Sequence, residues 1–330
     1  MQICMICYIG GVKNFIHRLF PALYNFAAKK KTFLRSIFIQ NIMGKIGLNV
    51  SRSNDYHSPL PSRDHLQKNI TRWNKPSRLV GVDYDLGRMK RDLKGLVAKY
   101  KKELDELPTY EEILSMHLGP GIPSIDGQLL YMMIRELRPK KYYEIGTGSS
   151  TYYAYLAGER NKGDGQPLEI VGIDPSPYEV LLKMSSIKII NKQVQDVDIR
   201  LFEKLGPRDV LFIDSTHVLK IDGDVSFLYL EVIPRLKQGV VIHAHDIPFP
   251  FNVPYPAKLH IMSKSWPVFW NEAMILQSFL AFNNDYQIKM SMPIIRHFDE
   301  KFLKKNFPNY KSVDQDPDTF SSLWFEKNSE

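Results

Sequence analysis

Two apolar runs of the sequence end in acidic residues that have histidines close by. Asp214 follows residues 209–213 and precedes His217 by three positions, and His245-Asp246 follows residues 239–243. If both runs are parallel strands, the two carboxylates face each other across neighbouring strand ends. Carboxylates with an imidazole suit a divalent cation, oxygen-rich enough for Mg²⁺ and open to Mn²⁺ or Zn²⁺. We therefore predict Asp214, Asp246 and His245 as metal ligands.

The same residues could carry catalysis. An imidazole beside a metal-bound hydroxyl can take its proton, which favours His217 as the base, with Asp214 and His245 as its catalytic neighbours. The alternative is that Asp214 bonds a cofactor loop while His217 and His245 only fix the backbone around it.

A second candidate site is the stretch "YYEIGTGSST", an apolar run that ends in a glycine turn. Gly146 and Gly148 allow a tight approach to a ligand, and a helix after the turn offers free backbone N–H groups. Thr151 stands where a dinucleotide-binding G-x-G-x-x-G motif has its third glycine, and the Gly-Lys-Ser/Thr of a phosphate-binding loop is missing. Glu144 would repel a pyrophosphate but suits the ammonium group of S-adenosylmethionine. A structural turn without a ligand is the alternative.

Two further strand ends offer contacts to a nucleoside. "VGIDP" ends in Asp174, a carboxylate that can accept both hydroxyls of a ribose. After "IIN", Gln193, Gln195 and Asp196 come where an adenine edge could be read.

The elements that position these residues alternate along the chain. Short apolar runs are separated by segments of helical length, which predicts an α/β doubly wound parallel sheet. The expected parallel strands are residues 142–145, 168–173, 187–190, 209–213 and 239–243. A helix over 269–282 and an antiparallel edge pair, 286–292 and 321–327, complete the sheet. Before it we expect helices over 86–107, with a Lys101–Asp105 pair, and from 124 onwards.

Five segments in this order resemble the class I S-adenosylmethionine-dependent methyltransferases, and most of all their methyltransferase domain 24 group. The segments are "YYEIGTGSSTYYA", "IVGIDPSP", "DVLFIDSTHVLKIDGDV", "LEVIPRLKQGVVIHAHDI" and "FWNEAMILQSFLAFN". The resemblance covers residues 115–327 and implies a seven-stranded, mostly parallel Rossmann-like sheet whose last strand is inserted antiparallel. It also implies the cofactor S-adenosylmethionine. The expected cofactor-binding residues are Glu144, Gly146, Thr147, Gly148, Ser150, Thr151, Asp174, Asp196 and Asp214.

Relatives of the macrocin O-methyltransferase type carry a metal-binding aspartate and a base histidine three apart after the fourth strand. Asp214 and His217 match that spacing. Those relatives have Glu-Asp after the fifth strand, whereas this chain has His245-Asp246, which leaves open whether the ion is kept and which ion it is.

The expected function is therefore methyl transfer from S-adenosylmethionine to a hydroxyl of a sugar-like or other small acceptor. An NAD(P)-binding oxidoreductase and a cofactor-binding module without turnover are the alternatives. A loop with Pro248, Phe249, Phe251, Tyr255 and Pro256, together with Trp266, Phe269 and Trp270, is expected to roof the acceptor pocket. Aromatic faces suit a sugar or a flat ring. The same aromatics could instead be core.

Charge and composition limit the possible partners and location of the protein. The net charge is +8 and the isoelectric point near 9.2, which favours weak attraction to anionic partners, but no nucleic-acid-binding motif accompanies the charge. Residues 1–84 are expected to be a basic extension and linker before a methyltransferase domain at 85–330. Residues 1–48 contain an amphipathic stretch for weak membrane-surface association or for packing on the protein. With only Cys4 and Cys7 and no apolar run long enough to cross a bilayer, we expect a cytoplasmic protein, peripheral to a membrane at most. The sequence does not determine the oligomeric state.

Overall fold

The computed structural model describes residues 39, 41–47, 56–119, 122–263, 267–312 and 320–328. The chain divides into two compact units, Met1–Lys68 and Asn69–Glu330. Within the first unit, residues 41–45 and α3 (Arg63–Lys68) are helical, and Ile39, Ile42 and Ile46 are exposed. Most of the stretch predicted to associate with a membrane surface lies outside the described residues, so that association stays a prediction. No helix among the described residues is both long and apolar enough to cross a membrane.

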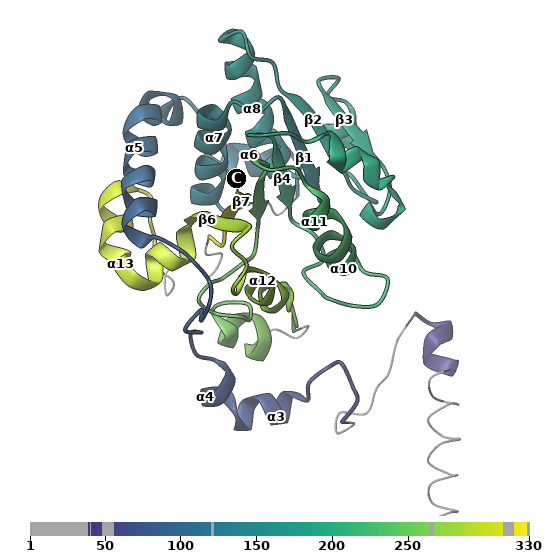
Figure 1. Cartoon of the computed structure of the whole chain (residues 1–330). Helices are drawn as coiled ribbons and strands as arrows, with labels where there is room; N and C mark the ends of the chain where they lie inside the picture. The colour runs from purple at the N-terminus through teal and green to yellow at the C-terminus, as the bar shows by residue number, and fades with distance from the viewer. Residues whose placement is uncertain are drawn as a thin grey trace, which may run out of the picture. The chain divides into compact units, whose positions relative to one another are not determined.

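The second unit is built on one seven-stranded sheet in the order β3-β2-β1-β4-β5-β7-β6 (Figure 1). The strands are β1 (Lys141–Ile145), β2 (Glu169–Ile173), β3 (Ile187–Ile190), β4 (Val210–Ile213), β5 (Val241–Ala244), β6 (Tyr286–Ser291) and β7 (Leu323–Lys327). The first five are parallel, and β7 runs antiparallel between β5 and β6. The predicted α/β fold and its inserted last strand are confirmed. A dinucleotide-binding sheet has the order 3-2-1-4-5-6, without this insertion.

Helices cover both faces of the sheet (Figure 1). The helical elements described in the second unit are α4 (Ile70–Trp73), α5 (Leu86–Asp105), α6 (Tyr110–Ser115), α7 (Ser124–Leu137), α8 (Ser149–Gly163), α9 (Glu179–Leu182), η1 (Val194–Asp196), η2 (Ile199–Lys204), α10 (Asp224–Phe227), η3 (Leu228–Val232), α11 (Ile233–Arg235), η4 (Lys258–Ser263), α12 (Glu272–Leu280) and α13 (Met292–Asn306). Helix α7 packs between α5 and α8, α13 packs on α5, and η3 packs with α10, α11 and α12.

Two of the predicted helices match the structure closely. Asp85 caps α5 by accepting a hydrogen bond from the Arg88 backbone N–H at 2.8 Å, which fixes the start of the helix. The expected Lys101–Asp105 ion pair is present at 2.9 Å on its exposed face. Helix α7 begins at Ser124, as the glycine-proline turn before it predicts.

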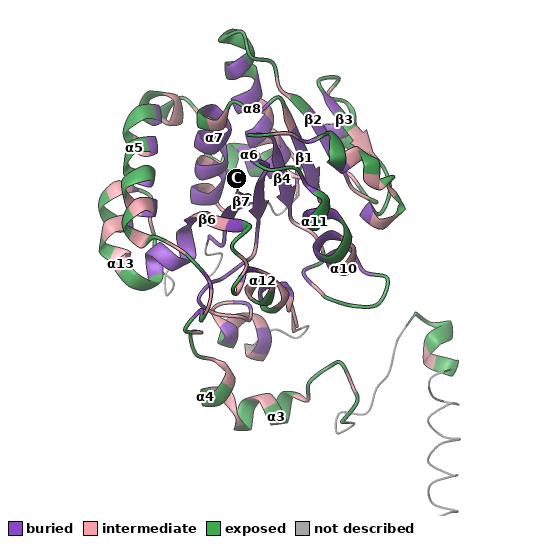
Figure 2. Ribbon diagram, viewed as in Figure 1, coloured by how far each residue is buried: buried purple, intermediate pink, exposed green. Residues whose placement is uncertain are grey.

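The core follows from strands that are buried on both faces (Figure 2). All residues of β4 and β5 are buried, as expected of central parallel strands flanked by helices. Leu79 and Val82 also enter this core, and the Phe282 N–H donates to the Gly81 carbonyl at 2.7 Å. These contacts tie residues 79–82 to the second unit. The predicted domain limit at residue 84 stays a prediction.

Candidate active site

The carboxyl ends of the parallel strands border two adjoining cavities, of about 560 and 340 Å³. The larger is lined by the glycine loop after β1, by the acidic and histidine residues after β4 and β5, and by Tyr178, Trp270 and Arg296. The smaller lies over β2 and is lined by Ile173 and residues 193–195. Gly146 and Asp214 line both cavities, so a single elongated ligand can occupy both.

The glycine loop is shaped by a steric requirement at Gly146. Its φ of +81° is unfavourable for other residues, and a Cβ there would lie 2.0 Å from the carbonyl oxygen of Asp214. The loop is held from the other side by Asp174, whose Oδ2 accepts hydrogen bonds from the Thr147 N–H at 2.8 Å and the Thr147 hydroxyl at 2.9 Å. The backbone from Gly146 to Gly148 therefore forms part of the cavity wall.

Glu144 lies behind this wall. It is fully buried and does not line either cavity, but its Oε1 accepts a hydrogen bond from the hydroxyl of Ser150, which lines the larger one. Its other oxygen, Oε2, has no hydrogen-bond partner in the described part of the chain. Burial raises the pKa of Glu144 to about 8, against the opposing effect of hydrogen bonds from Ser150 and Thr151. A cation at the Ser150 side of the wall would favour the ionised carboxylate.

Neither of the other two predicted nucleoside ligands lines a cavity. Asp174 is half-buried beside the loop, and its Oδ1 also accepts from the Ser176 N–H at 2.7 Å. Asp196 is exposed and lines neither cavity, whereas its neighbour Gln195 lines the smaller one. Gln195 is thus placed closer to the cavity than Asp196 for reading an adenine edge.

Four side chains from β4 and β5 converge at the larger cavity. His217 Nε2 lies 3.1 Å from Asp214 Oδ1 and 3.4 Å from Asp246 Oδ2. His245 Nδ1 lies 3.6 Å from Asp214 Oδ1 and 3.7 Å from Asp246 Oδ1. The structure therefore brings together all four residues that the sequence indicated for metal binding and proton transfer.

Unusual backbone conformations make this convergence possible. His217 and Asp246 both have positive φ values, +59° and +57°, in the left-handed region that residues with a Cβ seldom adopt. On a regular strand Asp246 would point away from His245, and the left-handed conformation turns it to the same side. Such strain persists where the surroundings hold it, often at functional sites.

Each histidine of this cluster is backed by a second buried carboxylate that the sequence analysis missed. His217 Nδ1 lies 2.8 Å from Glu272 Oε2, and Tyr229 donates its hydroxyl proton to Glu272 Oε1 at 2.8 Å. His245 Nε2 lies 3.2 Å from Asp126 Oδ2. Both acids interrupt apolar helical stretches, "SIDGQLL" and "NEAMIL", and a buried acid in such a pattern was the available signal.

Charge interactions within the cluster shift the pKa values of its side chains. Burial alone would lower the pKa of His217, but hydrogen bonds to Asp214 and Glu272 and the charge of Asp246 outweigh it and raise that pKa well above its usual range. The pKa of His245 is raised in the same way, because the charges of Asp214 and Asp246 outweigh the opposing effect of burial. The pKa of Asp214 falls despite burial, because His245 and His217 stabilise its ionised form.

The donor set fits a divalent cation. Ligand atoms of Asp214, His217 and Asp246 all lie within 4.8 Å of one another, and His245 Nδ1 has no hydrogen-bond partner among the residues described. Metal-binding histidines ordinarily donate their outer ring N–H to a carboxylate, and both histidines here have one in place. A mixed nitrogen and oxygen set suits Mn²⁺, Fe²⁺ or Zn²⁺ better than Mg²⁺.

The expected aromatic roof is only partly at the cavity. Trp270 lines it, with its ring centroid 4.6 Å from that of His217, and Tyr255 lines it while stacking on Phe251. Phe249 is fully buried in the core, which is the alternative considered for these aromatics. Trp266 lies outside the described residues.

Comparison with known proteins matches part of the chain to a methyltransferase family. Residues 143–247 match the family model Methyltransf_24, a methyltransferase domain. An uncharacterized protein of Archaeoglobus fulgidus is 25% identical over 160 residues, covering 46% of this chain and 71% of that protein.

Similar solved structures include a SAH-bound O-methyltransferase from Bacillus cereus, 12% identical over 72% of this chain and 98% of that one, with a TM-score of 0.42. They also include TomG of Streptomyces achromogenes, an O-methyltransferase bound to SAM, 14% identical over 75% and 92% of the two chains, with a TM-score of 0.40.

Proposed function

We propose that this chain, which carries an S-adenosylmethionine-dependent methyltransferase domain, transfers the methyl group to a hydroxyl of a small acceptor. One observation carries the proposal. The cluster of Asp214, His217, His245 and Asp246 opens into the same cavity as the glycine loop that would hold the cofactor. A proton-accepting cluster beside a methyl donor is what transfer to oxygen requires, because an alcohol must lose its proton as it is methylated.

The cofactor would lie along the two adjoining cavities. Its methionine part would contact the loop from Gly146 to Ser150, with its ammonium close to the Ser150 hydroxyl and to Glu144 behind it. Its nucleoside would reach the smaller cavity past Gly146, towards Gln195. Asp174 already accepts three hydrogen bonds from the chain, and it can still accept one from a ribose hydroxyl because a carboxylate has about four acceptor positions.

His217 is the base of this proposal, but it must first be neutral. The neighbouring carboxylates hold a proton on it, and an imidazolium cannot accept another. A divalent cation held by Asp214, Asp246 and His245 would supply Lewis acidity to the acceptor hydroxyl. With their charge compensated in this way, Asp214 and Asp246 would no longer retain the proton on His217. Glu272 meanwhile keeps the ring oriented through Nδ1, so Nε2, which faces Asp214 and Asp246, would be the atom that takes the proton.

Two other functions remain to be separated from this one by experiment. An NAD(P)-dependent oxidoreductase is disfavoured by the antiparallel β7 between β5 and β6 and by Glu144 behind the glycine loop. A cofactor-binding module without turnover would have no need for the paired buried carboxylates behind His217 and His245.

The test combines binding and transfer. Calorimetric titration with S-adenosylhomocysteine (SAH) and with NAD⁺ should show binding of the first alone. Transfer of a labelled methyl group to a panel of hydroxylated small molecules, with Mn²⁺ or Mg²⁺ present, should then fall about a hundredfold in His217→Ala. A chain that binds NAD⁺ in preference to SAH refutes the proposal, and one that binds SAH but methylates nothing favours the module.

A further inference from the structure

Arg296, on α13, is a buried charge that has no counter-ion among the described residues. Its side chain lines the larger cavity, and the residue is only 9% exposed. Its Nη1 is buried with no hydrogen-bond partner, and no described carboxylate forms an ion pair with it. Instead, its Cζ lies 4.8 Å from the ring centroid of Phe320 and 5.4 Å from that of Tyr255.

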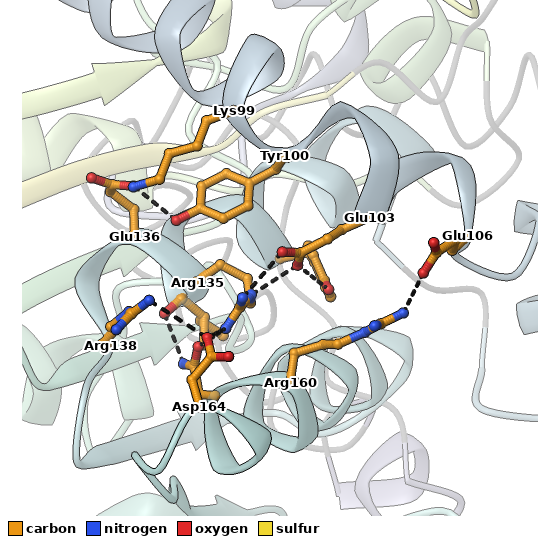
Figure 3. A network of polar contacts seen from close by, with 12 residues as sticks. Lys99, Tyr100, Glu103, Glu106, Arg135, Glu136, Arg138, Arg160 and Asp164 are labelled. Atoms are coloured by element: carbon orange, nitrogen blue, oxygen red, sulfur yellow. Dashed lines mark hydrogen bonds and ion pairs between the residues drawn. The ribbon is translucent and has the colours of Figure 1, made fainter.

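Another arginine of the same chain shows how a structural buried guanidinium is satisfied. Arg135 is 7% exposed, and it donates to Glu103 at 2.8 and 3.1 Å, to Asp164 at 3.0 Å and to Asn161 (Figure 3). These ion pairs raise the pKa of Arg135 against the effect of burial, whereas burial lowers the pKa of Arg296. Unlike Arg135, Arg296 is therefore a cation that has no anionic partner in the described part of the chain.

A guanidinium keeps its charge under all ordinary conditions, so Arg296 cannot escape the cost of burial by losing a proton. Burying a charge without a partner is costly. The two aromatic rings offset part of this cost but leave the N–H groups of Nη1 without an acceptor among the described residues. An oxygen anion in the cavity would satisfy them, and guanidinium forms paired hydrogen bonds with carboxylate and phosphate.

Arg296 also lines the same cavity as the proposed reaction centre. Phe320, which contacts its guanidinium, is followed by Ser321, whose hydroxyl donates to Asp246 Oδ1 at 2.8 Å. A molecule in this cavity that presents a hydroxyl to His217 and Asp246 can therefore place a second group at Arg296.

We propose that the methyl acceptor is a hydroxylated anion whose carboxylate or phosphate group is bound by Arg296, while its reacting hydroxyl lies at the Asp214, His217 and Asp246 end. This rests on the proposed methyltransferase function and adds the substrate class to it. The cavity then has a cationic end that selects and orients the acceptor and an acidic end that deprotonates it.

The test uses the full chain and three matched probes of one sugar: glucose, glucuronate and glucose 6-phosphate. Thermal unfolding is followed at constant ionic strength with saturating SAH. Glucuronate or glucose 6-phosphate should raise the unfolding temperature and glucose should not, and which of the two acts better distinguishes a carboxylate from a phosphate acceptor. In Arg296→Gln, the same shift should need at least about ten times more anion, the value of a charge-assisted hydrogen bond. Equal responses to all three sugars, or an anion response that survives in Arg296→Gln, overturn the inference.

Two control variants keep the test decisive. Arg135→Gln should lower the unfolding temperature in the absence of anion, because it breaks satisfied ion pairs, while Arg296→Gln should leave it equal or higher. Destabilisation of both variants alike would mean that Arg296 has a structural partner, which overturns the inference.

Residues 313–319 contain Asp314, Asp316 and Asp318, so a variant with all three changed to Asn is the second control. An anion response that appears only in this variant would mean that these aspartates neutralise Arg296 in the wild-type chain. That result also overturns the inference.

Failure of this inference is distinguishable from failure of the proposed function. If SAH does not bind, the methyltransferase proposal fails. If SAH binds and the anions have no effect, only the assignment of an anionic acceptor fails.

Discussion

Binding of the cofactor should release a proton from Glu144. This carboxyl is fully buried, its pKa is raised to about 8, and one hydroxyl separates it from the cavity. It is therefore mostly protonated at neutral pH in the free protein. At an effective dielectric constant of about 20, a ligand ammonium roughly 5 Å away contributes about 3 kcal/mol, enough to lower the pKa of Glu144 from about 8 to about 6.

The affinity for the cofactor should therefore depend on pH. Between the two pKa values the free protein holds the proton and the complex does not, so affinity rises with pH. The affinity for SAH should increase about tenfold from pH 6 to pH 7.5, a range in which most of the ligand amine stays protonated. Calorimetry in buffers of different ionisation enthalpy should detect release of up to one proton near pH 7.

Matched variants separate this linkage from other effects of pH. Glu144→Gln removes the titrating group and should make SAH affinity nearly independent of pH. Asp174→Asn should weaken binding of the ribose by about 1.5–3 kcal/mol while preserving the pH dependence, because it leaves Glu144 intact. A wild-type affinity that is constant over this range, or a pH dependence that persists in Glu144→Gln, would refute the placement of the ammonium beside Glu144.

Three further predictions concern the acidic cluster and the loop. Asp246→Asn and a chelator should each abolish methyl transfer without releasing SAH, since an amide is a poor ligand for a hard cation, and added Mn²⁺ should partly rescue the variant; transfer that is indifferent to chelator would remove the ion from the account. Glu272→Gln should lower the pKa of His217, followed by NMR of the imidazole, and reduce turnover about 10- to 100-fold; an unchanged titration would show that Glu272 does not orient the base. Gly146→Ala should destabilise the protein by about 2–5 kcal/mol in urea unfolding and weaken SAH binding, because its Cβ would lie 2.0 Å from the Asp214 carbonyl oxygen, and a fully stable variant would contradict the loop geometry.

The fold could be predicted because its signals are local. Buried parallel strands appear as short apolar runs, and the glycine turn and the helix start at Asp85 are set by neighbouring residues. The strand limits in the structure differ from the predicted ones by at most two residues, and those of β3 agree fully. Even the inserted β7 was anticipated, although from resemblance and not from the pattern of residues 321–327.

The site was predictable only in part, because the buried carboxylates behind its two histidines come from residues distant in sequence. Asp214 and His217 are three positions apart and could be paired on spacing, but Glu272 is 55 positions from His217 and Asp126 is 119 from His245. Arg296 had no local signal either. Its meaning depends on the absence of a described partner, which only the three-dimensional arrangement reveals.

The most direct test of the account is a crystal structure of the protein with SAH, soaked with Mn²⁺. The account predicts that the sulfur of SAH faces the part of the cavity lined by His217 and Asp246, with anomalous density for manganese between Asp214 and Asp246. SAH bound with its sulfur directed away from this cluster would contradict the claim that the loop and the cluster form one active site.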